Sequence, residues 1–354
     1  MRIVLEKRDT RSRTITVLVP FISFFISLAL GAIVLGISGV NPLMTYSYMF
    51  QGAFGTWIDF TETLVKASPL ILTGLGVALA FRLRFWNIGA EGQFVWGAIG
   101  TTWVIVFWKF VPLSLLLPVG LVMGMVAGSI WAGIPAILKA HWAVDETLTT
   151  LMLNYVAILT AEYLYYGPWR DPDGFGFPGT AQFAPEAWLS RFSGRAHYGF
   201  FIALVLAVLL WFLISKTRWG FEIKMIGKNP KAARCLGVRI ERNIIITLLI
   251  SGALAGLAGA CEVTGISHRL QKGINMGYGF TAIIIAWMAQ LNPIACVFVA
   301  ILMAGLLVGG DQIQMMVGLP ASMGLVIQGL LLFPLLAGSV FTEYRLRIVH
   351  VVEE

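Results

Sequence analysis

A series of long apolar runs limits what this chain of 354 residues can fold into. A helix needs about 20 mostly apolar residues to cross the hydrocarbon core of a bilayer. Runs near this length lie at about 15–37, 64–81, 89–108, 113–138, 147–166, 198–215, 244–262, 277–290, 294–309 and 321–341. Because their apolar residues are continuous rather than alternating, they exclude an outer-membrane barrel. We therefore expect an all-α, polytopic membrane protein with about ten transmembrane helices.

The overall composition supports a membrane protein and excludes several other classes. Hydrophobic residues make up 58% of the chain and charged residues 12%, roughly half the 25% that is typical of soluble domains. These values exclude a soluble enzyme, a disordered chain and a nucleic-acid-binding module. The formal net charge of +7 therefore indicates cytoplasmic loops rather than a nucleic-acid partner.

The basic residues predict the orientation of the spans. If the N-terminus is cytoplasmic, 18 of the 25 Lys and Arg residues fall on the inner side and seven on the outer side, as the positive-inside rule requires. The first run is too long for a signal-peptide core, so we expect it to be retained. Both termini are then cytoplasmic. The predicted parts are a tail at 1–14, a transmembrane domain at 15–343 and a tail at 344–354, with an outer loop at 167–197 and a cytoplasmic loop at 216–243.

The outer loop divides the ten predicted spans into two halves of five. Halves with an odd number of spans have opposite orientations, and inverted repeats of this kind build many transporters around broken helices. The third span of each half starts with a Gly-rich break, at 87–93 and 273–279. Irregular backbone at membrane depth is tolerated where it lines a cavity, although each segment could also be an ordinary loop. The breaks supply these candidates for a translocation path: Asn87, Gly89, Gln93, Asn275 and Gly277.

Two polar side chains inside apolar runs add to these candidates. Glu91 lies about one turn into its run, where an ionisable group should pair or face water. It either lines the path or forms a structural ion pair with Arg82 or Arg84. Asn154 either lines the path or, more in keeping with its place in a span, forms a hydrogen bond between helices. The run at 251–260 carries small residues every three or four positions and predicts close helix packing.

The sequence offers no sign of catalytic, metal or cofactor chemistry. Its three cysteines and four histidines show neither paired nor metal-ligand spacing. A Walker-type phosphate-binding motif is also missing, so this chain does not bind ATP by that route.

The cytoplasmic loop at 216–243 carries a capped helix. Asn229 is a good N-cap and Pro230 suits the first helical position, while Gly237 suits the C-terminal stop. The pattern predicts a short helix over about 230–236. A basic loop that only set topology would need no such helix, so the loop is more typical of a docking site.

Four motifs together resemble one family. Residues 225–237 resemble the coupling-helix segment of ABC importer permeases of the ribose and branched-chain amino acid type. Residues 87–93, 145–155 and 167–180 resemble more narrowly the nucleoside or simple-sugar permeases that work with a basic-membrane-protein lipoprotein. Lys224, Lys228, Lys231 and Cys235 depart from the usual pattern of the coupling segment.

The resemblance implies a transport subunit without enzymatic activity in a bacterial plasma (inner) membrane. Its expected partners are a second permease subunit, a cytoplasmic ABC ATPase and an extracytoplasmic substrate-binding protein. Coupling to the ATPase would fall on Gly227, Asn229, Pro230, Ala233, Arg234 and Gly237. The cargo would be a nucleoside or a related simple sugar.

Two other classes remain open at this point. A secondary transporter or channel could use inverted repeats and broken helices without ATP, but it would not need a docking helix. A membrane enzyme would need clustered acidic or His residues at one membrane face. The pair Asp145 and Glu146 is the sole adjacent acidic pair before the C-terminal tail.

Overall fold

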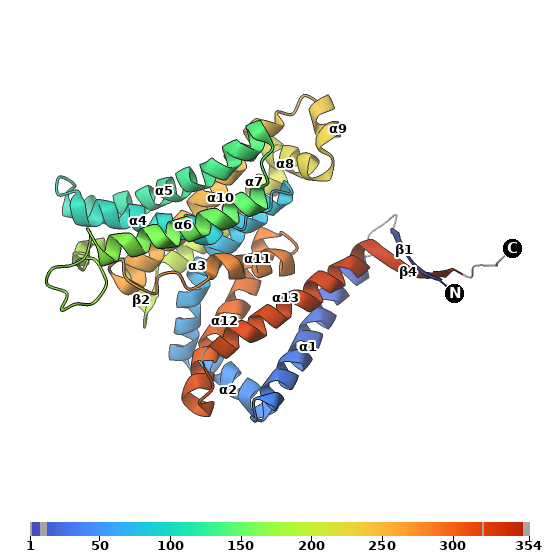
Figure 1. Cartoon of the computed structure of the whole chain (residues 1–354), viewed down its shortest axis with the longest axis horizontal. Coiled ribbons are helices and arrows are strands. Elements are labelled where there is room, and N and C mark those ends of the chain that lie inside the picture. Colours follow the sequence, from blue (N-terminus) through green and yellow to red (C-terminus); the bar gives the residue numbers. More distant parts are fainter. Residues whose placement is uncertain (1, 8–12, 321, 350–354) are drawn as a thin grey trace. The chain divides into compact units, whose positions relative to one another are not determined.

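The computed structural model describes residues 2–7, 13–320 and 322–349. The chain forms two compact units. A central unit comprises Thr56–Gly305, and a terminal unit comprises the chain up to Gly55 and from Leu306 onward. Both consist mostly of helices (Figure 1), which confirms the predicted class. The four short strands of the described residues were not predicted, so the fold is mainly rather than entirely helical.

The central unit holds most of the helices. They are α3 (Trp57–Arg82), α4 (Ala90–Phe107), α5 (Leu113–Trp142), α6 (Glu146–Tyr166), α7 (Gly199–Lys216), α8 (Arg218–Lys228), α9 (Pro230–Cys235), α10 (Ile240–Glu262), α11 (Tyr278–Met288) and the first part of α12 (Pro293–Val317). Helix α10 continues into one π-helical turn, η2 (Val263–Ser267). The capping box of Thr56 and Asp59 starts α3 seven residues before the predicted span, because the cap, not the apolar run, fixes the first turn.

Glycines bring α4, α5 and α10 into backbone contact. A Cβ atom at Gly97 would overlap the backbone of Gly256, and a Cβ at Gly256 would overlap the carbonyl group of Gly124. Gly128 and Gly252 exclude each other's Cβ atoms in the same way. Close helix packing of the Gly- and Ala-rich run is therefore confirmed. It joins α10 to helices that come much earlier in the chain, as Figure 1 shows.

The terminal unit contains the two ends of the chain. Its helices are α1 (Arg13–Ile37), α2 (Pro42–Phe54), the last part of α12 and α13 (Ser322–Glu343). Leu35, Met49, Ile313 and Ile327 form its buried core. Strand β1 (Arg2–Lys7) pairs antiparallel with β4 (Tyr344–Val349). Helix α2 was not predicted, and its start is fixed by the Asn41 side chain and by Pro42.

The helices account for the predicted spans, but not all of them span a bilayer by length and composition. Each of the ten apolar runs contains a helix. Five helices of the described residues are long and apolar enough to cross a membrane alone, and a bent pair in α1 and α2 raises the number to six. Helix α11 has 11 residues and is about 17 Å long, whereas the hydrocarbon core is about 30 Å thick.

The segment of the predicted outer loop contains turns and two short strands. It contains a three-residue 3-10 helix, η1 (Pro185–Ala187), and a hairpin of β2 (Arg191–Ser193) and β3 (Ala196–His197). Its backbone also pairs with the segment after η2, where the Phe183 N–H donates to the His268 carbonyl oxygen at 2.8 Å.

Candidate functional site

The break before α4 is held by a buried amide pair. Asn87 Nδ2 donates to Gln93 Oε1 at 3.2 Å, and Gln93 Nε2 donates back to Asn87 Oδ1 at 3.1 Å. Asn87 Oδ1 also accepts the Gly89 N–H, and Asn87 Nδ2 donates to Ser251 Oγ of α10. The polar atoms of the broken backbone are thus satisfied inside the protein, as burial requires.

Asn154 of α6 supports the same break from the opposite side. Its Oδ1 accepts the Gly92 N–H at 2.8 Å, and its Nδ2 donates to the Ile88 carbonyl oxygen at 2.9 Å. Thr150, one turn earlier, accepts the Ile88 N–H. The predicted hydrogen bond between helices is therefore confirmed for Asn154. Its side chain is buried, and its role in a path stays a prediction.

Glu91 binds the first turn of α11. Its Oε1 accepts the Gly277 N–H at 2.9 Å and its Oε2 accepts the Gly279 N–H at 2.6 Å. The side chain is 1% exposed. Free N–H groups at a helix start carry partial positive charge, so they can satisfy a buried carboxylate without a cation.

The alternative of an ion pair between Glu91 and Arg82 or Arg84 is therefore wrong. None of the ion pairs among the described residues includes Glu91. Arg82 instead donates from Nε and Nη2 to the Leu291 carbonyl oxygen, at 3.0 and 2.6 Å. Leu291 lies just after the end of α11, so the acid and the base bind opposite ends of one helix. Sequence proximity could not show this, because both contacts join residues about 200 positions apart.

The second break places its two candidates differently. Gly277 has a φ of +80°, a conformation that glycine adopts without steric cost, and it donates its N–H to Glu91. Asn275 is exposed, and its side chain forms no hydrogen bond with the part of the chain that the structure describes. The structure brings Gly277 to Glu91 but leaves Asn275 outside the polar network of the first break.

The predicted helix of the cytoplasmic loop is present as α9. The Asn229 side chain accepts the Ala232 N–H at 3.2 Å, Pro230 occupies the first turn, and Gly237 has a φ of +76°. Ala233 is fully buried. The cap and the stop are thus confirmed, and Figure 1 shows α9 beside α8 at the end of α5 and α10.

The side chains of this segment divide into two groups. Gly227 and Ala233 are buried against the central unit, while Asn229, Pro230, Arg234 and Gly237 are exposed. Arg234 forms an ion pair with Glu241 at 3.1 Å, and its side chain remains 71% exposed. The segment therefore presents a fixed helix whose polar side is open to a partner.

The acidic pair at the start of α6 has a structural role. Asp145 Oδ1 caps α6 by accepting the Leu148 N–H at 2.8 Å. Glu146 is buried and forms an ion pair with Lys139 of α5 at 2.6 Å. Asp145 binds a backbone N–H and Glu146 binds Lys139. The pair therefore does not resemble the free acid and base of a membrane enzyme.

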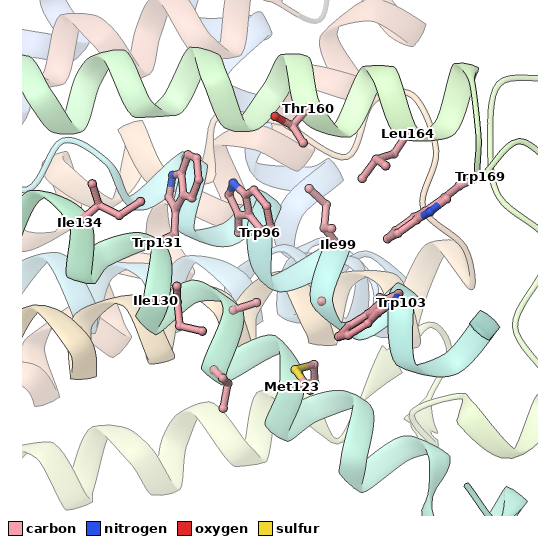
Figure 2. Close-up of a pocket in the computed structure, with 13 residues that line it drawn as sticks. Trp96, Ile99, Trp103, Met123, Ile130, Trp131, Ile134, Thr160, Leu164 and Trp169 are labelled. Carbon is pink, nitrogen blue, oxygen red and sulfur yellow. The ribbon is translucent and has the colours of Figure 1, made fainter. Parts of the chain in front are cut away.

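An apolar cavity of about 510 Å³ lies between α4, α5 and α6. Figure 2 shows the Trp96 and Trp131 rings side by side on its wall, with centroids 4.7 Å apart. Trp103 and Trp169 line the other end, and Thr160 adds a hydroxyl group. The rest of the lining is hydrocarbon and thioether.

Two buried histidines, His197 and His268, lie outside the predicted membrane spans, and the sequence did not single them out. Burial lowers the pKa of His197 to about 4, with Arg191 and His268 adding to the effect. Burial also lowers the pKa of His268, whose ring stacks on Trp188 with centroids 4.1 Å apart. Both rings are therefore neutral at pH 7.

Comparisons with known proteins identify the family. The family model of the branched-chain amino acid transport system permease component matches residues 60–336. The glucose ABC transporter permease protein TsgB13 of Haloferax volcanii is 35% identical over 97% of this chain and 93% of its own. The guanosine permease NupP of Bacillus subtilis is also 35% identical, over 94% and 95%, and the nucleoside permease NupB of Lactococcus lactis is 31% identical, over 84% and 85%. The chain therefore belongs to the family of branched-chain amino acid transport system permease components.

Proposed function

We propose that this chain is the permease subunit of an ATP-driven ABC importer for nucleosides or related simple sugars. The observation that carries the proposal is its 35% identity, over more than nine-tenths of its length, to permeases named for glucose and for guanosine. A glucose molecule and a guanosine molecule share a hydroxyl-bearing sugar ring. We infer that this ring is the common element of the cargo.

The exposed side of α9 is the proposed ATPase contact. Its Asn229 cap fixes the first turn, and buried Ala233 holds the helix to the central unit. Arg234 is open to an acidic partner group, Pro230 starts the helix, and the conformation of Gly237 ends it. Gly227 lets α8 approach α3 directly. These features suit a rigid helix that an ATPase partner could displace.

The proposed topology has ten spans in two inverted halves, with broken third spans at α4 and α11 and both termini in the cytoplasm. The domain limits are those predicted above. The two breaks meet: the Gly279 backbone lies directly against that of Glu91. Such a meeting of half-helix starts is expected near the midplane of an inverted-repeat transporter.

The proposed path runs along this junction, between this chain and a second permease. Its candidates stay Asn87, Gly89, Glu91, Gln93, Asn154, Asn275 and Gly277. The first five of them are buried and bonded internally in this conformation, so the path would open only when the helices shift.

The mechanism requires no bond-making in this chain. An extracytoplasmic binding protein would deliver the cargo, and closure of the ATPase dimer would displace α9 and rock the two permeases between outward and inward access. A ligand shifts such an equilibrium only by its differential affinity for the two states. ATP binding in the separate ATPase would supply that difference.

Two matched charge reversals test the coupling assignment. Arg234→Glu should reduce ATPase co-purification and uptake of radiolabelled nucleoside at least tenfold, because the exposed cation of α9 is inverted. Arg239→Glu makes the same charge change in the same loop outside α9 and should leave both nearly intact. Equal effects of the two variants, or none of either, would contradict the assignment. Uptake by the purified chain alone under an ion gradient would favour a secondary transporter.

A further inference from the structure

The last residue of α3 contacts two elements that are far apart in the sequence. The backbone of Gly227 lies so close to the Arg82 carbonyl oxygen that a Cβ atom at Gly227 would overlap it. The Arg82 guanidinium donates two hydrogen bonds to Leu291, at 3.0 and 2.6 Å. Arg82 therefore links the end of α8 to the end of α11.

The contact at Gly227 is close to the proposed ATPase-docking helix. Gly227 is in the last turn of α8, and the Asn229 cap of α9 follows two residues later. Helix α8 is also tied to α10, since Asn243 Nδ2 donates to Glu222 Oε2 at 3.1 Å. Because so short a connection has little freedom, a displacement of α9 would act directly on the Arg82 backbone.

The end of α11 depends on its neighbours. Gln290 and Leu291 have φ angles of +50° and +59°, and two consecutive non-glycine residues in this region are uncommon. Such backbone persists where the surroundings hold it in place. The Arg82 hydrogen bonds do so here, together with the Trp86 ring, which stacks on Trp287 at 5.8 Å.

The start of α11 is held by the same stretch of chain. Glu91 accepts the N–H groups of Gly277 and Gly279, and Arg82 and Glu91 are separated by a single turn and the break before α4. Both charges complement the helix dipole, with the acid at the N-terminus and the base at the C-terminus. Residues 82–91 therefore bind both the start of α11 and the segment just after its end.

We infer that Arg82 is the positioning residue through which the ATPase-docking segment moves α11. The inference rests on the proposed function and adds a route to it. A displacement of α9 passes through Gly227 to the Arg82 backbone, and the Arg82 side chain carries it to the half-helix at the proposed path. A contiguous set of packed contacts is the physical requirement for such coupling, and function must then be measured directly.

The test uses the whole transporter in proteoliposomes, with the second permease, the ATPase and the binding protein. Arg82→Gln removes the charge and the forked donors. It should lower uptake at least tenfold while the ATPase still co-purifies and hydrolyses ATP within twofold of the unmodified rate. Arg82→Lys keeps the charge but lacks the planar fork of donors, and it should give an intermediate rate.

Arg84→Gln is the matched control. Arg84 is exposed, and its side chain forms no hydrogen bond with the described part of the chain, so its loss should not change uptake. Normal uptake by Arg82→Gln would overturn the inference. Loss of the ATPase from Arg82→Gln would overturn it too, because Arg82 would then support docking rather than position α11.

A second readout follows α11 itself. In a chain with Cys235→Ser, a Met288→Cys label should change its modification rate when ATP is added, because α11 moves. Arg82→Gln should abolish this response, and an unchanged response would contradict the inference. Failure of the two proposals is distinguishable: if Arg234→Glu prevents ATPase binding while Arg82→Gln transports normally, only the route through Arg82 is wrong.

Discussion

The starts of α4 and α11 are both irregular and Gly-rich, but they are held in different ways. The start of α4 is enclosed by side chains from three elements: the amide pair of Asn87 and Gln93, Asn154 of α6, and Ser251 of α10. At the start of α11, the Glu91 carboxylate accepts the N–H groups of Gly277 and Gly279.

This difference predicts that the start of α4 is more rigid than the start of α11. Several neutral hydrogen bonds share the support of α4, so the loss of one leaves others in place. Two N–H groups of the first turn of α11 bind one carboxylate through charge-assisted bonds, which are individually stronger, so a single substitution at Glu91 removes both. We therefore expect α4 to act as the fixed frame and α11 as the element that can move.

Replacement of Gly279 by Val should have the largest effect. A Cβ atom there would lie 2.6 Å from the Glu91 Cα, and backbone cannot yield as a side chain does, so the loss of stability should be about 3 kcal/mol. Thermal unfolding in detergent measures it. Gly36→Ala, at a position with open space around it, is the control and should have little effect.

Removal of the Glu91 carboxylate should release α11 and leave α4 in place. Glu91→Ala leaves the N–H groups of Gly277 and Gly279 without their acceptor, and the free energy of unfolding should fall by about 2–3 kcal/mol. Glu91→Gln keeps an acceptor oxygen and should lose less stability. Hydrogen exchange should accelerate in peptides covering 277–282 but not in those covering 85–93. Equal acceleration in both would break the distinction between the two starts.

Asn154→Ala should have the converse pattern. The Gly92 N–H and the Ile88 carbonyl group would lose their partner, and about 2 kcal/mol of stability should be lost. Exchange should rise in 85–93 and stay unchanged in 277–282. Faster hydrogen exchange in 277–282 would show that the start of α11 depends on the hydrogen bonds that hold the start of α4.

The pH dependence of stability should include a contribution from His197, which belongs to neither helix start. His197 has a native pKa of about 4 against 6.5 for the free side chain, so the unfolded chain binds the proton first as the pH falls. Stability is complete above pH 6.5 and decreases toward pH 4, by up to about 2 kcal/mol at pH 5. His197→Gln should flatten this part of the curve. An unchanged curve would contradict the burial of His197.

The smallest effect should come from Ser251→Ala. The Ser251 hydroxyl accepts from Asn87 and donates to the Gly76 carbonyl oxygen at 2.8 Å. Because Asn87 keeps its bonds with Gln93, the loss should be about 1 kcal/mol. A loss as large as that of Glu91→Ala would show that the support of α4 is not shared.

Local features were readable from the sequence. Asn229 and Pro230 predicted the start of α9, and the small residues of α10 predicted its close packing. The Gly-rich segments 87–93 and 273–279 lie at the starts of α4 and α11, and their role as breaks of membrane spans stays a prediction. Helix α2 and the β1–β4 pair were not foreseen, because the first is short and amphiphilic and the second joins the two ends of the chain.

The sequence by itself determined most of the helices, the cap of α9 and the membrane environment, since these depend on neighbours a few residues away and on composition. Only the tertiary structure decided the partners of Glu91, which is buried, and of Arg82, which is half-buried. It assigned Glu91 to Gly277 and Gly279, and Arg82 to Leu291, because a buried charge binds whatever complementary dipole the packing brings to it. Here that packing brought the two ends of α11, and not the oppositely charged side chain nearest in the sequence.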